Sequence, residues 1–548
     1  MPGILDIVSK LTGFSASSFR SELSTFPKEQ ILVIALVRSA EPIAFTSLFP
    51  YVYFMVRDFQ IAATDADIAK YAGYLSSIFA FSQFLTCYQW GKFADKYGRK
   101  PTIVIGLSGS IMSLLILGFS ENYYWAFFAR CLNGMLNGNV AVIRTLIGEN
   151  VGTSKKEHQA LAFATMPLIW QAGSVIGPMI GGFLSGNGTI DTTVRLSGLK
   201  EKFPYALPNI VLSGLLGFSL LVAVFFLEET HHQHKFRRDY FIEVSDWIKV
   251  NGLGFSKRER PWYTFQPKDI HIFRESSEQS AFLASHEESI HRHKSSSVEE
   301  TSTEEQSSWK VLSQGHIFFG VVCNFLMSLH LTINDEFFPV YLAYDIVRDP
   351  KTGLLVSHFP FNIQGGLSYN SEDTGQLLSL TGIFGIFVLL VVFPYVNHHY
   401  NTLTIYKSMI IIFPICYTLT PYLTLLANHK SISMVAAYCL TSFKTLAVSI
   451  STPQIIILVH NTSPPKQRGM INGAIISISA LARTTGPLIW GYVFAFSENH
   501  AVGWVSWWGL TAVSLLAIYV SKYLKDDSIE IQEDIQLMGQ LEDVDRID

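Results

Sequence analysis

Ionisable side chains inside otherwise apolar runs are the residues of this chain whose types and positions point to chemistry. The set comprises Arg38, Glu41, Arg130, His330, Asp335, Glu336 and Lys444. A charged group costs about 2.5–3.5 kcal/mol at the centre of a bilayer on insertion scales. Groups at such positions are typical of proton transfer and of the binding of a charged solute, so these are the candidate functional residues.

Glu41 is the candidate proton carrier among them. It lies on the same helical face as Arg38, three positions earlier, and it precedes Pro42. A carboxyl group in a medium of low dielectric constant favours its neutral form and can exchange a proton. The alternative is an intrahelical ion pair between Arg38 and Glu41 that satisfies itself. For Arg130 the residues themselves indicate a charge partner of a group such as Glu41.

A second group of candidates lies in the run 316–343. Aligning the Phe-Pro dipeptide near the end of this run with the one in the first apolar run places His330 opposite Glu41. We therefore expect His330 to line a central cavity. Asp335 and Glu336 then fall towards the outer end of the helix, either as an outer gate or proton entry, or as a satisfied helix-end cluster.

Basic side chains outnumber acidic ones in the candidate cavity. Lys444 and Arg483 lie in later apolar runs and add to the charges of Arg38 and Arg130. This balance favours an anionic or zwitterionic solute, unless pairing between the side chains cancels it.

Twelve apolar runs position these side chains. A spanning helix needs about 20 apolar residues to cross about 30 Å of hydrocarbon. Runs of that length lie near 31–56, 68–90, 101–120, 122–147, 160–186, 206–227, 316–343, 374–396, 403–427, 431–460, 469–496 and 501–524. The 548 residues are 49% hydrophobic and 15% charged, whereas soluble proteins carry about 25% charged residues. The sequence predicts an all-α integral membrane protein.

The polar segment 228–315 divides the chain into an N-terminal half, 31–227, and a C-terminal half, 316–524. Its basic, aromatic start and its Ser-, Glu- and His-rich remainder predict a largely disordered cytoplasmic linker with room for a short helix. We expect the segment 1–30 and the acidic tail 525–548 to be cytoplasmic as well.

The turn 91–101 sets the orientation of the helices. It carries Lys92, Lys96, Arg99 and Lys100, and basic loops stay on the cytoplasmic side. Both termini are therefore expected inside, in either the vacuolar or the plasma membrane. Glycine at position 91 also leaves room for close helix packing.

An internal repeat supports two six-helix pseudo-repeats. Residues 173–182 and 482–491 share the pattern small-x-x-x-Gly-Pro-x-Ile-x-Gly. Parallel repeats of this kind are typical of secondary transporters. Small residues let helices approach closely, which seals one end of the bundle while permitting alternating access. The residues concerned are Gly173, Gly177, Pro178, Gly182, Gly486 and Pro487.

On these motifs the chain resembles the major facilitator superfamily, in its twelve-helix drug/proton antiporter branch. The turn from Gly91 to Lys100 is similar to the signature between the second and third helices. Residues 128–134 resemble the arginine motif of the fourth helix, which implies a proton-coupling role for Arg130. Residues 173–182 resemble the antiporter motif of the fifth helix.

Further stretches are similar to fungal and plant zinc-induced-facilitator-like carriers, namely 38–42, 47–51, 335–339 and 365–369. The superfamily resemblance also implies a cytoplasmic latch, in which Asp95 pairs with Arg99 and meets the positive end of a helix in the other half. The latch comprises Gly91, Asp95, Gly98, Arg99 and Lys100.

Together these features predict a secondary active transporter that moves a small organic solute by alternating access, as a proton-coupled antiporter in the lipid bilayer. We expect a monomer without cofactor or metal site. The net charge of −4 gives no case for nucleic acid. The alternative is a transport-deficient nutrient sensor that signals through the linker and tail. A membrane enzyme is disfavoured, because the runs contain no nucleophile–base or metal constellation.

Overall fold

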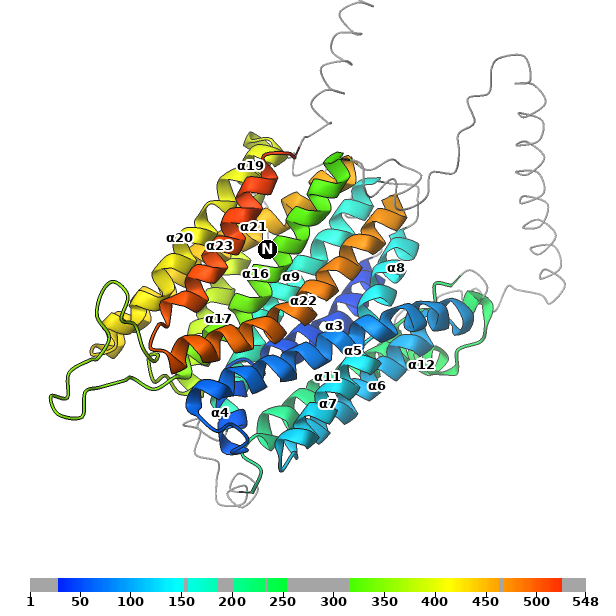
Figure 1. The fold of residues 1–548 in the computed structure, drawn as a ribbon. Coiled ribbons are helices and arrows are strands. Elements are labelled where there is room, and N and C mark those ends of the chain that lie inside the picture. The colour runs from blue at the N-terminus through cyan, green and yellow to red at the C-terminus, as the bar shows by residue number, and fades with distance from the viewer. Residues whose placement is uncertain are drawn as a thin grey trace, which may run out of the picture.

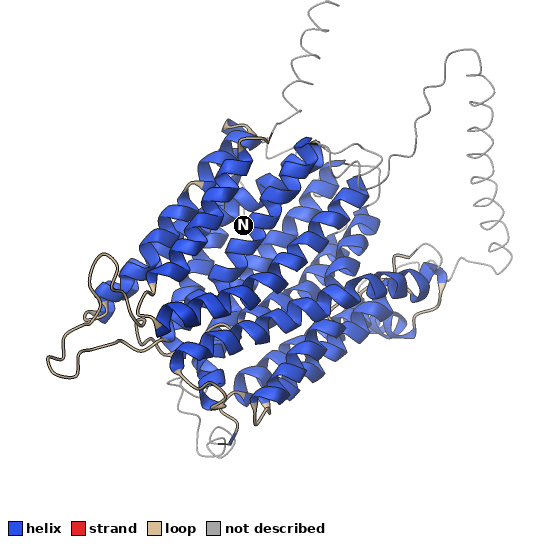
Figure 2. Cartoon of the chain, viewed as in Figure 1, coloured by secondary structure: helices blue, strands red, loops and turns tan. Residues whose placement is uncertain are grey.

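The computed structural model describes residues 28–151, 156–185, 202–231, 234–253, 315–462 and 468–524. Within these ranges the chain is nearly all helix (Figure 2). Strand-like pairing there is limited to four isolated bridges around the loop between residues 344 and 370. The predicted all-α fold is confirmed.

The N-terminal half supplies six membrane-crossing elements. They are α3 (Lys28–Thr46) with α4 (Val52–Asp58), α5 (Ile68–Tyr97), α6 (Arg99–Gly118), α7 (Tyr123–Leu136) with α8 (Asn139–Val151), α9 (Lys156–Leu184) and α11 (Ala206–Phe226). Figure 1 shows them as the blue and cyan part of the bundle.

The C-terminal half supplies six more. They are α16 (Gly315–Ala343), α17 (Ser371–Phe387) continued by η3 (Val388–Val392) and α18 (Phe393–His399), α19 (Thr402–Ile410) continued by α20 (Ile412–Leu419) and η4 (Thr420–Leu426), α21 (Lys430–Asn461), α22 (Arg468–Asn499) and α23 (Trp504–Ser521). Eight spans of the described chain are long and apolar enough to cross a membrane. The other four crossings are more polar or broken.

Two of the expected spans are not continuous helices. The run 31–56 breaks after Thr46, where Pro50 supplies no backbone N–H to continue the helix. The hydroxyl of Thr46 donates to the carbonyl oxygen of Pro42 at 2.8 Å. The run 122–147 breaks at Asn137 and Gly138, and the side chain of Trp90 fills the space where a Cβ at Gly138 would lie. Both breaks fall beside candidate functional residues.

The two halves pack together at the end of the bundle opposite the turn 91–101, here called the distal end. There α5 lies against α22, and α9 lies against α17 (Figure 1). A Cβ built at Gly73 would lie 2.5 Å from the carbonyl oxygen of Pro487, and one at Gly182 would lie 2.9 Å from the Cα of Gly375. Backbones this close leave no room for larger side chains, so the glycines close the distal end.

The other end, here called the basic end, is arranged differently. A Cβ built at Gly91 would meet nothing within 4 Å. The expected close packing at Gly91 is therefore absent from this structure. The reason is that the two halves meet along the distal part of α5, which leaves its basic end open.

The beginning of the linker is structured. Residues Tyr240–Leu253 form the helix α12, which packs against α11. Most of the linker and both termini lie outside the described residues, so their expected disorder stays a prediction.

Candidate functional site

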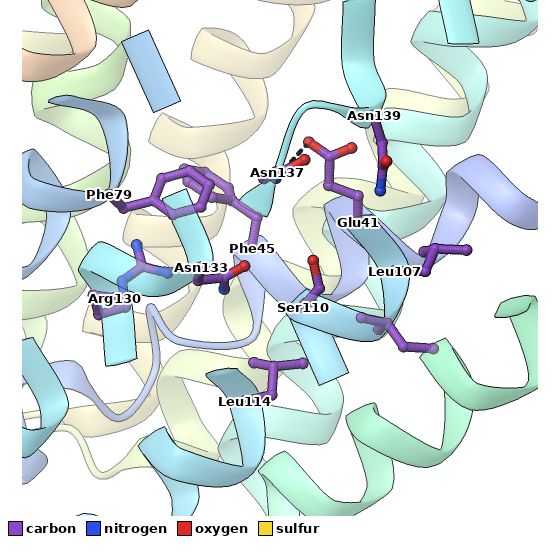
Figure 3. Close-up of a pocket in the computed structure, with 12 residues that line it drawn as sticks. Glu41, Phe45, Phe79, Leu107, Ser110, Leu114, Arg130, Asn133, Asn137 and Asn139 are labelled. Carbon is purple, nitrogen blue, oxygen red and sulfur yellow. Dashed lines mark hydrogen bonds between the residues drawn. The ribbon is translucent and has the colours of Figure 1, made fainter. Parts of the chain in front are cut away.

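A pocket in the N-terminal half contains two of the predicted residues, Glu41 of α3 and Arg130 of α7 (Figure 3). Amide side chains separate them, and Figure 3 shows Asn133 between the two charges, with Asn137 directed at Glu41. The pocket is lined by Glu41, Ala44, Phe45, Phe79, Leu107, Ser110, Leu114, Arg130, Asn133, Asn137, Asn139 and Leu216. Its polar surface therefore combines charges with neutral hydrogen-bonding groups.

Glu41 has partners on both carboxylate oxygens. Arg38 forms an ion pair with Oε2, and the side-chain amide of Asn137 donates to Oε1 at 3.2 Å. The intrahelical pair weighed from the sequence is thus present. Asn137 was not anticipated, because it reaches Glu41 only through the break between α7 and α8.

Arg130 is buried and does not pair with Glu41 in the described structure. Its Nε donates to the carbonyl oxygen of Leu75 at 3.3 Å, and its guanidinium carbon lies 4.6 Å from the centre of the Phe79 ring. The expected charge pairing between Arg130 and Glu41 is therefore wrong for this conformation. Arg38, one helical turn away from Glu41, forms the ion pair that was expected of Arg130.

The charge that acts on Arg130 comes from the other half of the molecule. Glu336 of α16 is 8% exposed and interacts electrostatically with Arg130 of α7 and with Arg483 of α22. Its Oε2 atom is buried and has no hydrogen-bond partner. The hydroxyl of Ser76 in α5 hydrogen-bonds to this carboxyl group. Glu336 is therefore a carboxyl group at the interface of the two halves whose hydrogen-bonding capacity is only partly filled.

Its neighbour Asp335 is placed differently. Asp335 Oδ1 accepts hydrogen bonds from Lys444 Nζ at 2.7 Å and from the side-chain amide of Asn334 at 3.3 Å. Lys444 lies near the middle of α21, so the acidic pair lies closer to mid-helix than the outer-end position expected from the sequence. The two adjacent carboxylates point to separate partners because successive helical residues lie about 100° apart on the helix.

His330 does not line a cavity with Glu41. It is 1% exposed, and its Nδ1 lies 2.9 Å from the hydroxyl of Tyr417 in α20. Its ring also packs 4.9 Å from that of Phe413. His330 is not among the residues that line the pocket containing Glu41, because the shared Phe-Pro ends fix its level along the helix but not the face it occupies.

The turn between α5 and α6 is braced by residues of the N-terminal half and of the start of the linker. Arg99 forms ion pairs with Asp95 at 2.6 Å and with Glu149 of α8 at 2.9 Å. The carboxylate of Glu229 accepts from the backbone N–H groups of Arg99 and Lys100 at 3.0 and 3.1 Å. An acid at this helix N-terminus is favourable because it satisfies free N–H groups and complements the helix dipole.

The linker adds a further brace, an ion pair of 2.6 Å between Lys100 Nζ and Asp239. Gly98 joins the two helices with a φ of +109°, which a residue with a Cβ rarely adopts. Asp95 itself is exposed, and its described ion pair is with Arg99. The expected contact between Asp95 and the other half is not made here. Glu149, Glu229 and Asp239 were missed, since an acid distant in sequence gives no signal of its partner.

The glycine-proline motifs serve two different contacts. A Cβ at Gly173 would lie 2.5 Å from Pro42, and Gly177 lies against Thr46, so both pack on α3 within the N-terminal half. Gly182 instead faces α17 of the other half, and a Cβ at Gly375 would lie 2.6 Å from the carbonyl oxygen of Pro178. In the second motif, Gly486 lies against α16 and Pro487 against Gly73.

Comparison with known proteins identifies the architecture. The family model described as Major Facilitator Superfamily matches residues 34–487. The chain belongs to this superfamily. The major facilitator superfamily multidrug transporter mfsB of Aspergillus fumigatus is 32% identical over 525 residues, which cover 92% of this chain and 85% of the relative. Protein ZINC INDUCED FACILITATOR-LIKE 1 of Arabidopsis thaliana is 26% identical over 480 residues, 87% of this chain and 86% of that one.

A solved structure has the same fold. The human organic anion transporter MFSD10 superposes with a TM-score of 0.54 at 14% identity, over 90% of this chain and 99% of that chain. At this identity the likeness shows the fold alone. The resemblance to the superfamily and to zinc-induced-facilitator-like proteins is therefore confirmed.

Membership of the major facilitator superfamily makes the protein a multi-pass membrane transporter of small molecules and not an enzyme. No group of His, Cys, Asp and Glu side chains within the described ranges could hold a metal ion. None of the relatives named above is described as a sensor.

Proposed function

We propose that this transporter exports a small organic solute in exchange for protons, and that Glu336 and Arg130 couple the two movements. The observation that carries the proposal is the position of Glu336. This carboxyl group is buried between the halves, one of its oxygens has no partner, and an arginine from each half acts on it.

The physical basis is the attraction between Glu336 and Arg130 across the interface. Opposite charges attract more strongly inside a protein than in water at the same separation, because the effective dielectric constant is lower. A proton on Glu336 removes its charge and with it this attraction. An empty carrier with ionised Glu336 is therefore held with its distal end closed, whereas the protonated carrier is free to reorient.

Exchange requires that the solute and the proton do not bind to the carrier at the same time. This requirement determines the charge of the solute. A positively charged group of the solute would interact with ionised Glu336 and would be displaced when Glu336 takes up a proton. A purely anionic solute would instead bind to Arg130 and Arg483 and favour the protonated carboxyl group, which by reciprocal linkage gives co-transport. We therefore expect a basic or zwitterionic solute, with Arg483 available for its anionic group.

The described conformation is one of the two states that alternating access requires. Its distal end is closed by Gly73 and Gly182, and Gly91 at the basic end faces open space. With both termini cytoplasmic, the basic end would face the cytoplasm, and we infer that the transporter opens to that side in a plasma or vacuolar membrane. Closure of the basic end would bring Gly91 and Asp95 against the other half, where they act as the latch. The transporter works as a monomer in this proposal.

Transport by the purified protein in liposomes tests the proposal. The probe is ethidium, a fluorescent organic cation, and pyranine inside the vesicles reports pH. A gradient with an acidic interior should drive ethidium uptake, and an uncoupler should abolish it. An ethidium gradient alone should move protons in the opposite direction. Ethidium flux without proton movement would contradict coupling, and binding without any flux would favour the sensor. Protein-free liposomes are the control.

A further inference from the structure

The helix α12 at the start of the linker carries an exposed apolar face. Its large apolar side chains that face outward are Tyr240, Phe241, Val244, Trp247 and Ile248. Their spacing of i, i+1, i+4, i+7 and i+8 gathers them on one side of the helix. Tyr240 is 67% exposed and Trp247 is 66% exposed, a degree unusual for side chains that large. Exposing this apolar face to water is unfavourable, so an apolar environment or an apolar surface should cover it.

The opposite face of α12 holds the helix in place against the transporter. Ile242 and Ser245 are buried there. Phe241 lies at the edge between the two faces, where its ring is 5.8 Å from that of Phe225, and Lys249 Nζ lies 5.0 Å from the ring of Phe226. Two positions about 12 Å apart along α12 thus contact neighbouring residues at the end of α11, so α12 crosses that end instead of continuing its axis.

The surroundings of α12 match the surface of a bilayer. Phe218 and Leu221 of α11 are exposed on the lipid-facing side of that helix, and the apolar face of α12 follows directly beyond them in the chain. The exposed basic residues Lys235 and Arg237 precede the helix. Tyrosine and tryptophan at the apolar–polar boundary, with basic residues beside them, are the composition of interfacial helices.

We propose that α12 is an interfacial helix that docks onto the anionic bilayer surface at the basic end of the transporter. Its face of Tyr240, Phe241, Val244, Trp247 and Ile248 lies among the lipids, and Lys235 and Arg237 contact their anionic headgroups. Asp239 immediately precedes α12 and forms the ion pair with Lys100. Docking therefore fixes the position of the acid that braces the turn between α5 and α6, and it links the lipid surface to that turn.

Depth measurements on the full-length transporter test this proposal. The five native cysteines are replaced by alanine, and one nitroxide label is attached in nanodiscs of phosphatidylcholine with phosphatidylserine. The labelled variants are Trp247→Cys and, to leave the tryptophan in place, Val244→Cys. Asp246→Cys, half-buried on the side of α12 that faces away from the apolar set, is the matched control. Collisions with oxygen report lipid, and collisions with a water-soluble nickel chelate report water.

The expected result is a several-fold higher oxygen-to-nickel ratio at positions 244 and 247 than at 246, with a depth of about 5–10 Å below the headgroups. Lys235→Gln with Arg237→Gln should reduce that ratio in discs with phosphatidylserine and leave it unchanged in discs of phosphatidylcholine alone. High nickel accessibility at positions 244 and 247 would overturn the proposal, since the face would then lie in water. Low accessibility to both reagents would overturn it too, because another protein segment would then cover the face.

Discussion

The interface between the halves and the interior of the N-terminal half treat their acidic groups in opposite ways. In the N-terminal half, Glu41 has Arg38 and Asn137, and at the start of the linker Glu229 accepts from the backbone of the turn. At the interface, Glu336 leaves one buried oxygen without a partner. An unsatisfied buried polar atom is unfavourable by about 1–3 kcal/mol, so it persists where another state or ligand can satisfy it.

Under the proposed mechanism, the paired carboxylates of Glu41 and Glu229 stabilise the fold, whereas Glu336 changes its charge during the transport cycle. A carboxylate with two good partners gains little from a proton, whereas Glu336 can exchange an attraction across the interface for a neutral, mobile state. The arginine that responds, Arg130, lies in the other half, so a proton at one atom alters the contact between two rigid bodies. Coupling by this route needs no large local rearrangement.

Glu336→Gln should have the largest effect, because it makes the neutral form of the side chain permanent. We expect proton-driven ethidium transport to be abolished. Exchange of labelled for unlabelled solute across the membrane should become slower, because the cationic solute loses its counter-charge, and independent of pH. The measurement is both assays in the same liposomes. Asp335→Asn is the matched control on the adjacent residue and should retain pH dependence. A Glu336→Gln carrier that still builds an ethidium gradient would contradict the assignment.

Asp95→Asn tests the latch at the basic end, where the carboxylate of Asp95 is exposed in its pair with Arg99, although Arg99 itself is buried. Such a pair contributes about 0–1 kcal/mol, so the melting temperature should change little. A latch worth 1–2 kcal/mol in the opposite conformation would, when lost, reduce transport by roughly 5–30-fold. Lys96→Gln, a charge change of one unit in the same turn, is the control. Full transport by Asp95→Asn with unchanged topology would mean that the turn only sets orientation.

Much of the fold was predictable because membrane spans are encoded locally. Apolar runs of membrane length gave the twelve crossings, and the paired glycine-proline motifs gave the two halves. The breaks at Pro50 and at Asn137 with Gly138 were not anticipated, since apolar composition continues through them. Their positions depend on what packs alongside, such as Trp90 beside Gly138.

The sequence predicted which residues belong to the site, but it did not predict which of them interact with each other. Arg130 and Glu336 were both candidates, yet more than 200 residues separate them, and no local pattern joins them. His330 shows the same limit, because its level along the helix did not tell which face it occupies. The linker was expected to be largely disordered, and so the braces from Glu229 and Asp239 were overlooked.

Glu41→Gln distinguishes the two carboxyl groups as proton carriers. The substitution leaves Arg38 without its counter-charge but keeps an oxygen for Asn137. We expect all modes of transport to slow alike by roughly fivefold, equivalent to about 1 kcal/mol, with pH dependence retained. The check is to measure the initial rates of proton-driven uptake and of exchange from about pH 5.5 to about pH 8, the range around neutrality in which a coupling group would change its charge. Selective loss of proton-driven uptake would instead make Glu41 the proton carrier.

Glu229→Gln should have the smallest effect on transport, because Glu229 has hydrogen-bond partners on both of its oxygens and is not a coupling group. One oxygen remains to accept from the backbone of Arg99 or Lys100, but the negative charge at the N-terminus of α6 is lost. Helix-capping substitutions reduce stability by about 0.5–2 kcal/mol, and we expect the melting temperature of the detergent-solubilised protein to fall accordingly. Glu121→Gln is the matched control, since its pair with Lys202 is 3.7 Å long and exposed. If both variants melt alike, the brace at the turn contributes nothing to the fold.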